Sequence, residues 1–367
     1  MKQFLLSIVL LVISCQPKPI SEADRQEAHA ANTMIIRDSF GVPHIYGETD
    51  TDAVFGLLYA QCEDDFQRVE DNYIWAIGRL AEVTGEAAIY SDLRAKLFMT
   101  TKEAKQRYER APETVKELCV AFADGINFYL KTHPEVTPKL ITHFEPWMPM
   151  YFSEGSIGGD IERISTQKIQ AFYEQGAALP KEESLAIARA QEAAEPAGSN
   201  GIAISGSRTK SGDALLLINP HTSFFFRGEV HVNSKEGLNA YGAVTWGQFF
   251  VYQGFNEKTG WMHTSTYTDV MDEYLESIRP QGDSLVYRYG TEDRLVQQQE
   301  VQLAYRDEDG RMQQKRFPIY RTHHGPITHM EEGKWVASAM MWDPVTALEQ
   351  SYARSKQSDY TGFREMM

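Results

Sequence analysis

The spacing of apolar residues changes part-way along this 367-residue chain, and this change constrains the fold more than any other feature. Up to about residue 175, apolar residues recur every three or four positions, which is typical of amphipathic helices. After residue 198 they form short runs between turn residues, which is typical of strands and hairpins. Residues 176–198 are rich in Ala and Glu and indicate an exposed linker or a solvated helix. We therefore expect an α+β protein whose helices lie mainly in the first half.

The first half begins with extended chain and continues as helices. Residues 34–46 predict two extended segments joined by a turn at Phe40-Gly41. Capping residues and a proline at a first-turn position mark where helices begin. Three amphipathic helices are expected: from Thr51-Asp52 to near Gly85, as one long helix or two in series; from Pro112 onward; and from about Ile161 to Tyr173.

The N-terminus has the pattern of a secretory signal. A charged start is followed by the apolar run 4–13, which is too short to span a bilayer. The run ends at Ser14-Cys15, which resembles the lipobox of bacterial lipoproteins, where the cysteine is lipidated. We predict a signal peptide over 1–15, a lipid anchor on Cys15 and a polar tether over 16–33. The implied location is the periplasmic face of the envelope, and Gln16 favours the outer membrane; a soluble secreted form is the alternative.

Composition disfavours several kinds of partner and site. The formal charge of −15 argues against a nucleic-acid partner, because phosphates would be repelled. The sequence has no HExxH motif and no Cys/His cluster with the spacing of a metal site. Cys62 and Cys119 lie on apolar helical stripes and are predicted to pack in the core, with a disulfide as the alternative in an oxidising compartment.

The dipeptide Gly198-Ser199 opens the first predicted strand of the second half. A serine hydroxyl is a weak nucleophile unless a base stands beside it, and no GxSxG elbow surrounds this one. Cleavage before Ser199 would create a free α-amino group with a pKa of about 7.7–8.0, which can take the hydroxyl proton. One residue would then supply both nucleophile and base. The alternative interpretation is an ordinary Gly-Ser turn.

Several spaced segments extend this interpretation. Residues 198–221 resemble the nucleophile segment of the penicillin acylase family of N-terminal-nucleophile hydrolases, which includes the acyl-homoserine-lactone acylases. The resemblance implies a four-layer αββα sandwich, self-processing into a heterodimer, and hydrolysis of small N-acyl amides. It implies a mainly helical small subunit over 34–175, a spacer over 176–198 and the start of a strand-rich large subunit over 199–367. Similar segments occur in family order at 35–86, 145–149, 254–274 and 321–327.

The resemblance also implies roles for individual residues. Ser199 would be the nucleophile, His221 would assist orientation and proton traffic, and the backbone N–H of Ser265 would form half of an oxyanion hole. A structural calcium ion would be bound by oxygen atoms, which suit calcium. Its implied ligands are Asp269, the Met271 carbonyl, Asp272 and Glu162, with Glu154 or Asp160 as alternatives to Glu162 and a solvated turn as the alternative for 269–272.

The sequence departs from the family pattern in two ways. Gly201 follows the nucleophile by two residues, and Ile202 stands where many members have tryptophan. In addition, the family's large subunit extends further and contains an asparagine that completes the oxyanion hole, for which no equivalent is found. The chain is then a fragment, is completed by a partner, or is inactive; we favour a fragment of an active acylase. The rival hypothesis is a catalytically silent lipoprotein that binds calcium or a ligand.

Overall fold

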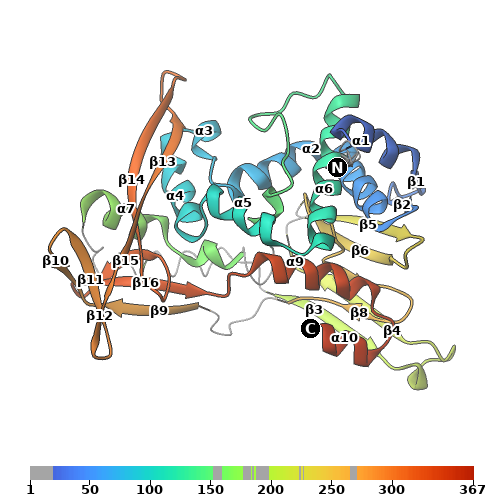
Figure 1. Cartoon of the computed structure of the whole chain (residues 1–367). Coiled ribbons are helices and arrows are strands. Elements are labelled where there is room, and N and C mark those ends of the chain that lie inside the picture. The colour runs from blue at the N-terminus through green and yellow to red at the C-terminus, as the bar shows by residue number, and fades with distance from the viewer. Residues whose placement is uncertain are drawn as a thin grey trace, which may run out of the picture.

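The computed structural model describes residues 20–151, 159–176, 183, 186, 198–222, 225, 227–264 and 271–367. The predicted signal peptide with Cys15, most of the predicted spacer, and the site candidates Ser265 and Asp269 lie outside these ranges. The described helices fall mainly in the first half and the strands mainly in the second, so the predicted α+β class is confirmed. Figure 1 shows helices α1, α2 and α6 beside one group of strands, with β9–β16 at the other end of the molecule.

The described residues contain short helices in addition to the three that were predicted from the sequence. Two helices that the periodicity did not reveal, α4 and α5, lie between the first and second predicted ones. The described α-helices are α1 (Glu22–Ala31), α2 (Asp50–Ala76), α3 (Ala81–Thr84), α4 (Ile89–Phe98), α5 (Thr101–Arg110), α6 (Glu113–Thr132), α7 (Thr166–Gln175), α9 (Pro344–Ala353) and α10 (Tyr360–Met366).

A six-stranded sheet joins the two halves of the chain. Its first two strands, β1 (Thr33–Arg37) and β2 (Pro43–Gly47), form the hairpin predicted for residues 34–46. Strand β2 then pairs in parallel with β5, which comes from far along the sequence. The sheet continues as β5 (Arg227–Ser234), β6 (Asn239–Thr245), β7 (Gln253–Phe255) and β8 (Gly260–Trp261).

Helix α2 packs on this sheet, and α6 packs on α2. A capping box starts α2 at Thr49, two residues before the predicted Thr51, because Thr49 and Asp52 bond each other's backbone N–H. Within α2, Asp65 has the non-helical angles φ −159° and ψ 72°, so two helical segments meet there at a kink, which corresponds to the predicted alternative of two helices in series. Cys62 and Cys119 are free and buried in the core between the helices, as predicted.

The predicted polar tether over 16–33 is wrong for residues 22–31. These residues form α1, which Ser21 caps by accepting a hydrogen bond from the N–H of Asp24. The Arg25 guanidinium bonds the buried Asp124 carboxylate of α6, with Nη2 to Oδ1 at 2.8 Å. The mainly polar sequence of α1 hid this role, since charges rather than apolar contacts fix much of the helix.

The remaining sheets lie at the far end of the molecule from α1 (Figure 1). The long β13–β14 hairpin packs against α3 and α4 around a second apolar core. Its neighbours are a three-stranded sheet in the order β15-β16-β9 and another in the order β10-β11-β12. The strands are β9 (Met271–Glu276), β10 (Ile278–Gln281), β11 (Ser284–Tyr289), β12 (Glu292–Leu295), β13 (Gln297–Arg306), β14 (Met312–Arg321), β15 (Ile327–Glu331) and β16 (Lys334–Met340).

The strand that begins at Ser199 belongs to a separate two-stranded sheet. Strands β3 (Ser199–Ile204) and β4 (Leu215–Pro220) form the predicted hairpin. Its apolar side chains are exposed, with Ile202 at 52% and Leu215 at 55%. The predicted sandwich has four layers. The described residues show one helical layer packed on the six-stranded sheet, and the strands β3 and β4 form part of a second sheet. Within the same residues, no helix combines the length and apolar character needed to cross a membrane.

Candidate active site

Ser199 and His221 lie side by side because of the hairpin register. Ser199 is the first residue of β3 and pairs with Pro220, the last residue of β4. The next residue, His221, donates its main-chain N–H to Ser199 Oγ at 3.2 Å. Gly198 before the strand has φ +97°, a left-handed conformation that glycine adopts without strain. The predicted pairing of the hydroxyl with the end of the next strand is therefore present.

The side chain of His221 faces amides rather than Ser199. The Nδ2 atoms of Asn200 and Asn219 each lie 3.3 Å from its Nε2. Amide nitrogens only donate, so these two contacts use Nε2 as their acceptor. Among the described residues, the contact between His221 and Ser199 Oγ is through the main chain, and the predicted role of the imidazole in proton traffic stays a prediction.

Thr264 is the site residue that the sequence interpretation missed. The N–H of Ser199 donates to Thr264 Oγ1 at 3.0 Å, and the same hydroxyl donates to the Ser199 carbonyl at 2.8 Å. The residue immediately precedes Ser265, the predicted oxyanion residue, which was the available signal. Thr264, from a segment far along the chain, therefore contacts the Gly198–Ser199 peptide bond through its N–H.

The residue before Thr264, His263, is partly buried and pairs with the buried Arg354. His263 Nε2 accepts a hydrogen bond from Arg354 Nη1 at 3.1 Å, and its ring stacks on Tyr252 with centroids 4.4 Å apart. Burial, and after it the positive charges of Arg354 and Arg227, lowers the pKa of His263 to about 4. Arg354 also donates to the Tyr252 carbonyl at 3.1 Å. This pair ties the segment that carries Thr264 to the helical C-terminal part of the chain.

The glycine that departs from the family pattern has a packing reason. A Cβ on Gly201 would fall on Sδ of Met262 and within 2.9 Å of its Cγ. Strand β3 therefore approaches the segment that ends in Thr264 so closely that only glycine fits without a shift of Met262. The contact packs β3 against the side chain of Met262, two residues before Thr264.

The predicted calcium ligands are described only in part. Met271 and Asp272 begin β9, where they pair with Met340 and Ala339 of β16. Glu162 lies in the 3₁₀ turn Gly159–Arg163, and its carbonyl accepts a hydrogen bond from Arg94 at 3.3 Å. Neither of the two groups of possible metal ligands found among the described residues includes Glu162 or Asp272. The calcium site stays a prediction.

Comparison with known proteins assigns the chain to a family. The family model described as penicillin amidase matches residues 32–367. The chain belongs to the penicillin amidase family.

The curated relatives that this chain matches are distant from it in sequence. An acyl-homoserine lactone acylase of Pseudomonas fluorescens is 23% identical over 362 residues, which cover 86% of this chain and 43% of the relative. The penicillin acylase 2 proenzyme of Pseudomonas sp. is 24% identical over 343 residues, which cover 81% of this chain and 44% of the relative. The chain thus spans less than half the length of these curated relatives.

Among solved structures, a thermostable penicillin G acylase from Alcaligenes faecalis is similar over a smaller part. It matches with a TM-score of 0.39 and 21% identity, over 45% of this chain and 30% of that one.

Proposed function

We propose that this chain carries the nucleophile of an amide hydrolase, the hydroxyl of Ser199, and that the chain cuts itself before this residue. The observation that carries the proposal is the hydrogen bond from the His221 main-chain N–H to Ser199 Oγ at 3.2 Å. Because Oγ accepts this bond, its own proton stays available for transfer to a base. Cleavage before Ser199 supplies that base, since an α-amino group with a pKa of about 7.7–8.0 is partly neutral near pH 7–8.

The first step of the proposal is processing. Ser199 Oγ attacks the Gly198 carbonyl, the C–N bond between Gly198 and Ser199 breaks, and the nitrogen takes the hydroxyl proton. Water then hydrolyses the resulting ester, which leaves a Gly198 carboxylate and a Ser199 α-amine. Thr264 supports this step, because its hydroxyl contacts both the N–H and the carbonyl of Ser199.

The second step is turnover of an N-acyl substrate. Ser199 Oγ attacks the substrate carbonyl while its proton passes to the α-amine. The C–N bond of the substrate breaks, the leaving amine takes that proton, and an acyl-enzyme ester remains on Oγ. Water resolves the ester in the same way. The N–H of Ser265 is the proposed donor to the developing oxyanion.

The substrate class follows from the chemistry and from the relatives. The names of the relatives specify acyl-homoserine lactones for one and penicillins for the other. Both are N-acyl amides, and this coarser class is what we propose here. We further propose that the two processed parts stay together as a heterodimer, with β2 and β5 paired across the cleavage site in one sheet. Calcium binding near 269–272 and a lipid anchor on Cys15 complete the proposal.

The test is hydrolysis of a panel of chromogenic N-acyl anilides with acyl chains of increasing length, alongside N-acyl-homoserine lactones. The purified protein should release the amine with an initial burst that is stoichiometric with Ser199, because the acyl-enzyme accumulates. Mass spectrometry of the quenched burst should place the acyl group on the peptide that begins at Ser199.

The matched control is Ser211→Ala, which removes an exposed hydroxyl from the turn of the same hairpin. This variant should behave as wild type, whereas Ser199→Ala should give neither burst nor acylated peptide. Equal rates for wild type and Ser199→Ala would contradict the proposal. A folded, calcium-binding protein without any turnover would support the rival hypothesis of a silent binding module.

A further inference from the structure

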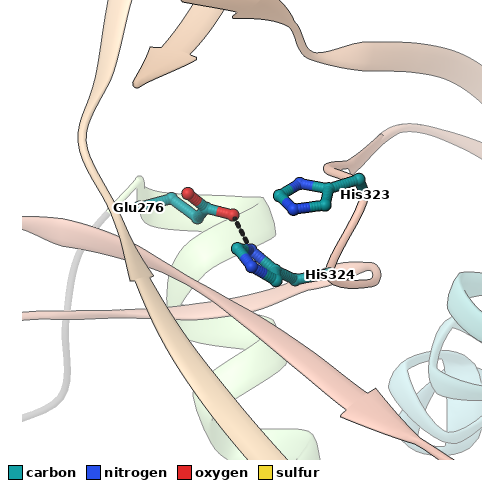
Figure 2. Close-up of side chains that lie close together, drawn as sticks. All are labelled: Glu276, His323 and His324. Carbon is teal, nitrogen blue, oxygen red and sulfur yellow. Dashed lines mark hydrogen bonds and ion pairs between the residues drawn. The ribbon is translucent and has the colours of Figure 1, made fainter. Parts of the chain in front are cut away.

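Two histidines and a glutamate converge far from Ser199. Glu276 is the last residue of β9, and His323 and His324 lie in the turn between β14 and β15. One potential ligand atom from each of the three lies within 4.8 Å of the others. Figure 2 shows the Glu276 carboxylate and the two imidazole rings facing a common space, with Glu276 bonded to His324.

We propose that Glu276, His323 and His324 bind a divalent transition-metal ion of the zinc class. Two imidazoles and one carboxylate are a ligand set that Zn²⁺ accepts. With metal–ligand distances of about 2.0–2.2 Å, the ligand atoms of a tetrahedral site are roughly 3.3 Å apart. Glu276 Oε1 and His324 Nδ1 are already 2.8 Å apart, and since all three atoms lie within 4.8 Å of one another, no pair needs to close by more than about 1.5 Å.

The carboxylate is placed where a cation would stabilise it. Glu276 is 4% exposed, and His324 is its hydrogen-bond partner among the described residues. A buried carboxylate is costly unless it is paired or coordinates a metal ion. A cation shared with both imidazoles would satisfy it more fully than a single ring N–H.

Aromatic residues hold both rings in place. Tyr274 stacks on His324 with centroids 3.8 Å apart and planes at 5°. Tyr289 meets His323 edge-on, with centroids 4.4 Å apart. The Tyr287 hydroxyl lies 3.0 Å from His323 Nδ1. A proton on that nitrogen donates to Tyr287 and leaves Nε2 free as a ligand, which is the usual outer contact of a metal-binding histidine.

The turn that carries the histidines is fixed from both sides. Arg321 at its start forms an ion pair with Glu103 of α5 and donates to the Leu97 carbonyl at 2.9 Å. Gly325 has φ +153°, and a Cβ there would collide with the Ser338 carbonyl of β16. These contacts fix the backbone of the turn. Metal binding therefore has to come from movements of the side chains, whose ligand atoms already lie within 4.8 Å of one another.

The second histidine and carboxylate group on this sheet is a poorer site. It consists of Glu273, His329 and Glu331, and His329 Nε2 lies 4.0 Å from Glu273. Burial, and after it the Lys168 ammonium, lowers the pKa of His329 to about 4, whereas burial raises the pKa of Glu273. The ligand atoms of Glu276 and His324 are closer together, at 2.8 Å, and we therefore assign the metal to Glu276, His323 and His324.

The experiment measures Zn²⁺ binding by the purified protein and by Ser199→Ala, after treatment with a chelator. We expect one equivalent of Zn²⁺ per chain that survives gel filtration in metal-free buffer. Co²⁺ should give the visible d–d absorption of a four-coordinate site. Equal binding by Ser199→Ala separates this inference from the proposed function, because the Ser199→Ala protein is expected to lack catalysis.

Variants identify the ligands. His323→Ala and Glu276→Gln should each weaken Zn²⁺ binding by about 100-fold or more, and Tyr287→Phe by about tenfold. His143→Ala, which removes an exposed histidine elsewhere, should leave binding unchanged. Because His323 lies in an exposed turn, its variant is expected to fold, and circular dichroism checks this. Absence of the bound equivalent in wild type, or unchanged binding in folded His323→Ala, would overturn the inference.

Discussion

Thr264 and Ser199 exchange two hydrogen bonds: the N–H of Ser199 donates to Thr264 Oγ1 at 3.0 Å, and Oγ1 donates to the Ser199 carbonyl at 2.8 Å. In the proposed mechanism, that nitrogen becomes the α-amine that serves as the base. The threonine hydroxyl is therefore expected to position the base in the processed protein.

Thr264→Val should lower kcat/KM for an N-acyl amide by about 100-fold, since a misplaced base loses most of its effect. Thr264→Ser keeps the hydroxyl and should retain activity within several-fold of wild type. Steady-state kinetics on processed protein measures both variants. Activity of Thr264→Val equal to that of Thr264→Ser would show that the hydroxyl has no positioning role.

The close approach of Gly201 to Met262 predicts a coupled pair. Gly201→Ala should destabilise the protein by about 1–3 kcal/mol, because its Cβ would displace the Met262 side chain. In the Met262→Ala background the same substitution should cost about 1 kcal/mol less, since the space is then free. Urea unfolding of the four proteins gives the coupling free energy. Strictly additive effects would mean that β3 does not pack on Met262.

Two ion pairs that join α1 to α6 should differ in their effect on stability. Arg25→Ala leaves the carboxylate of Asp124, which is 1% exposed, without its partner and should cost about 1–3 kcal/mol. Lys131→Ala breaks an exposed pair with Glu27 and should change the free energy of unfolding by less than about 1 kcal/mol. Thermal unfolding of both variants checks the contrast. A small effect of Arg25→Ala would argue that α1 contributes little to the fold.

Acid should weaken the fold through His263. Its pKa is lowered to about 4 in the folded protein, first by burial and then by Arg354 and Arg227. The unfolded chain, with a pKa of about 6.5, binds the proton more tightly, so stability is lost as the pH falls from about 6.5 to about 4. From pH 7.5 to pH 5 this one group should remove about 2 kcal/mol.

The variant His263→Gln isolates that contribution. The difference in free energy of unfolding between wild type and His263→Gln should shrink by about 2 kcal/mol from pH 7.5 to pH 5. The comparison cancels other titrating groups, such as Asp92, whose pKa burial raises to about 6 and which acts in the opposite direction. A difference that is constant with pH would show that His263 has the same pKa in the folded and the unfolded protein.

Local patterns predicted the parts of the fold that depend on near neighbours. The hairpin β3–β4 follows from alternating residues around a turn, and it alone brings His221 to Ser199. The capping box of α2 was predicted two residues too late, because Thr49 and Thr51 are both capable caps in sequence. Helix α5 carried a capping box of its own, from Thr100 to Glu103, which periodicity alone overlooked.

Contacts between distant segments could not be predicted in this way. Thr264 reaches Ser199 only because β8 ends beside β3, which the sequence does not specify. Likewise, Glu276 lies near His323 and His324 only because β9 belongs to the same sheet as β15, which follows the two histidines. Their spacing in the sequence is not that of a known metal-binding motif. Charge pairing also misled the sequence interpretation, since the polar residues 22–31 form a docked helix rather than a tether.

The most direct test of the central claim is the intact mass and N-terminal sequence of the purified protein, measured beside Ser199→Ala. The account predicts that wild type gives two fragments, the second beginning at Ser199, and that Ser199→Ala gives one uncleaved chain. An uncleaved wild-type chain, or cleavage at the same bond in Ser199→Ala, would contradict the claim that Ser199 makes its own N-terminus.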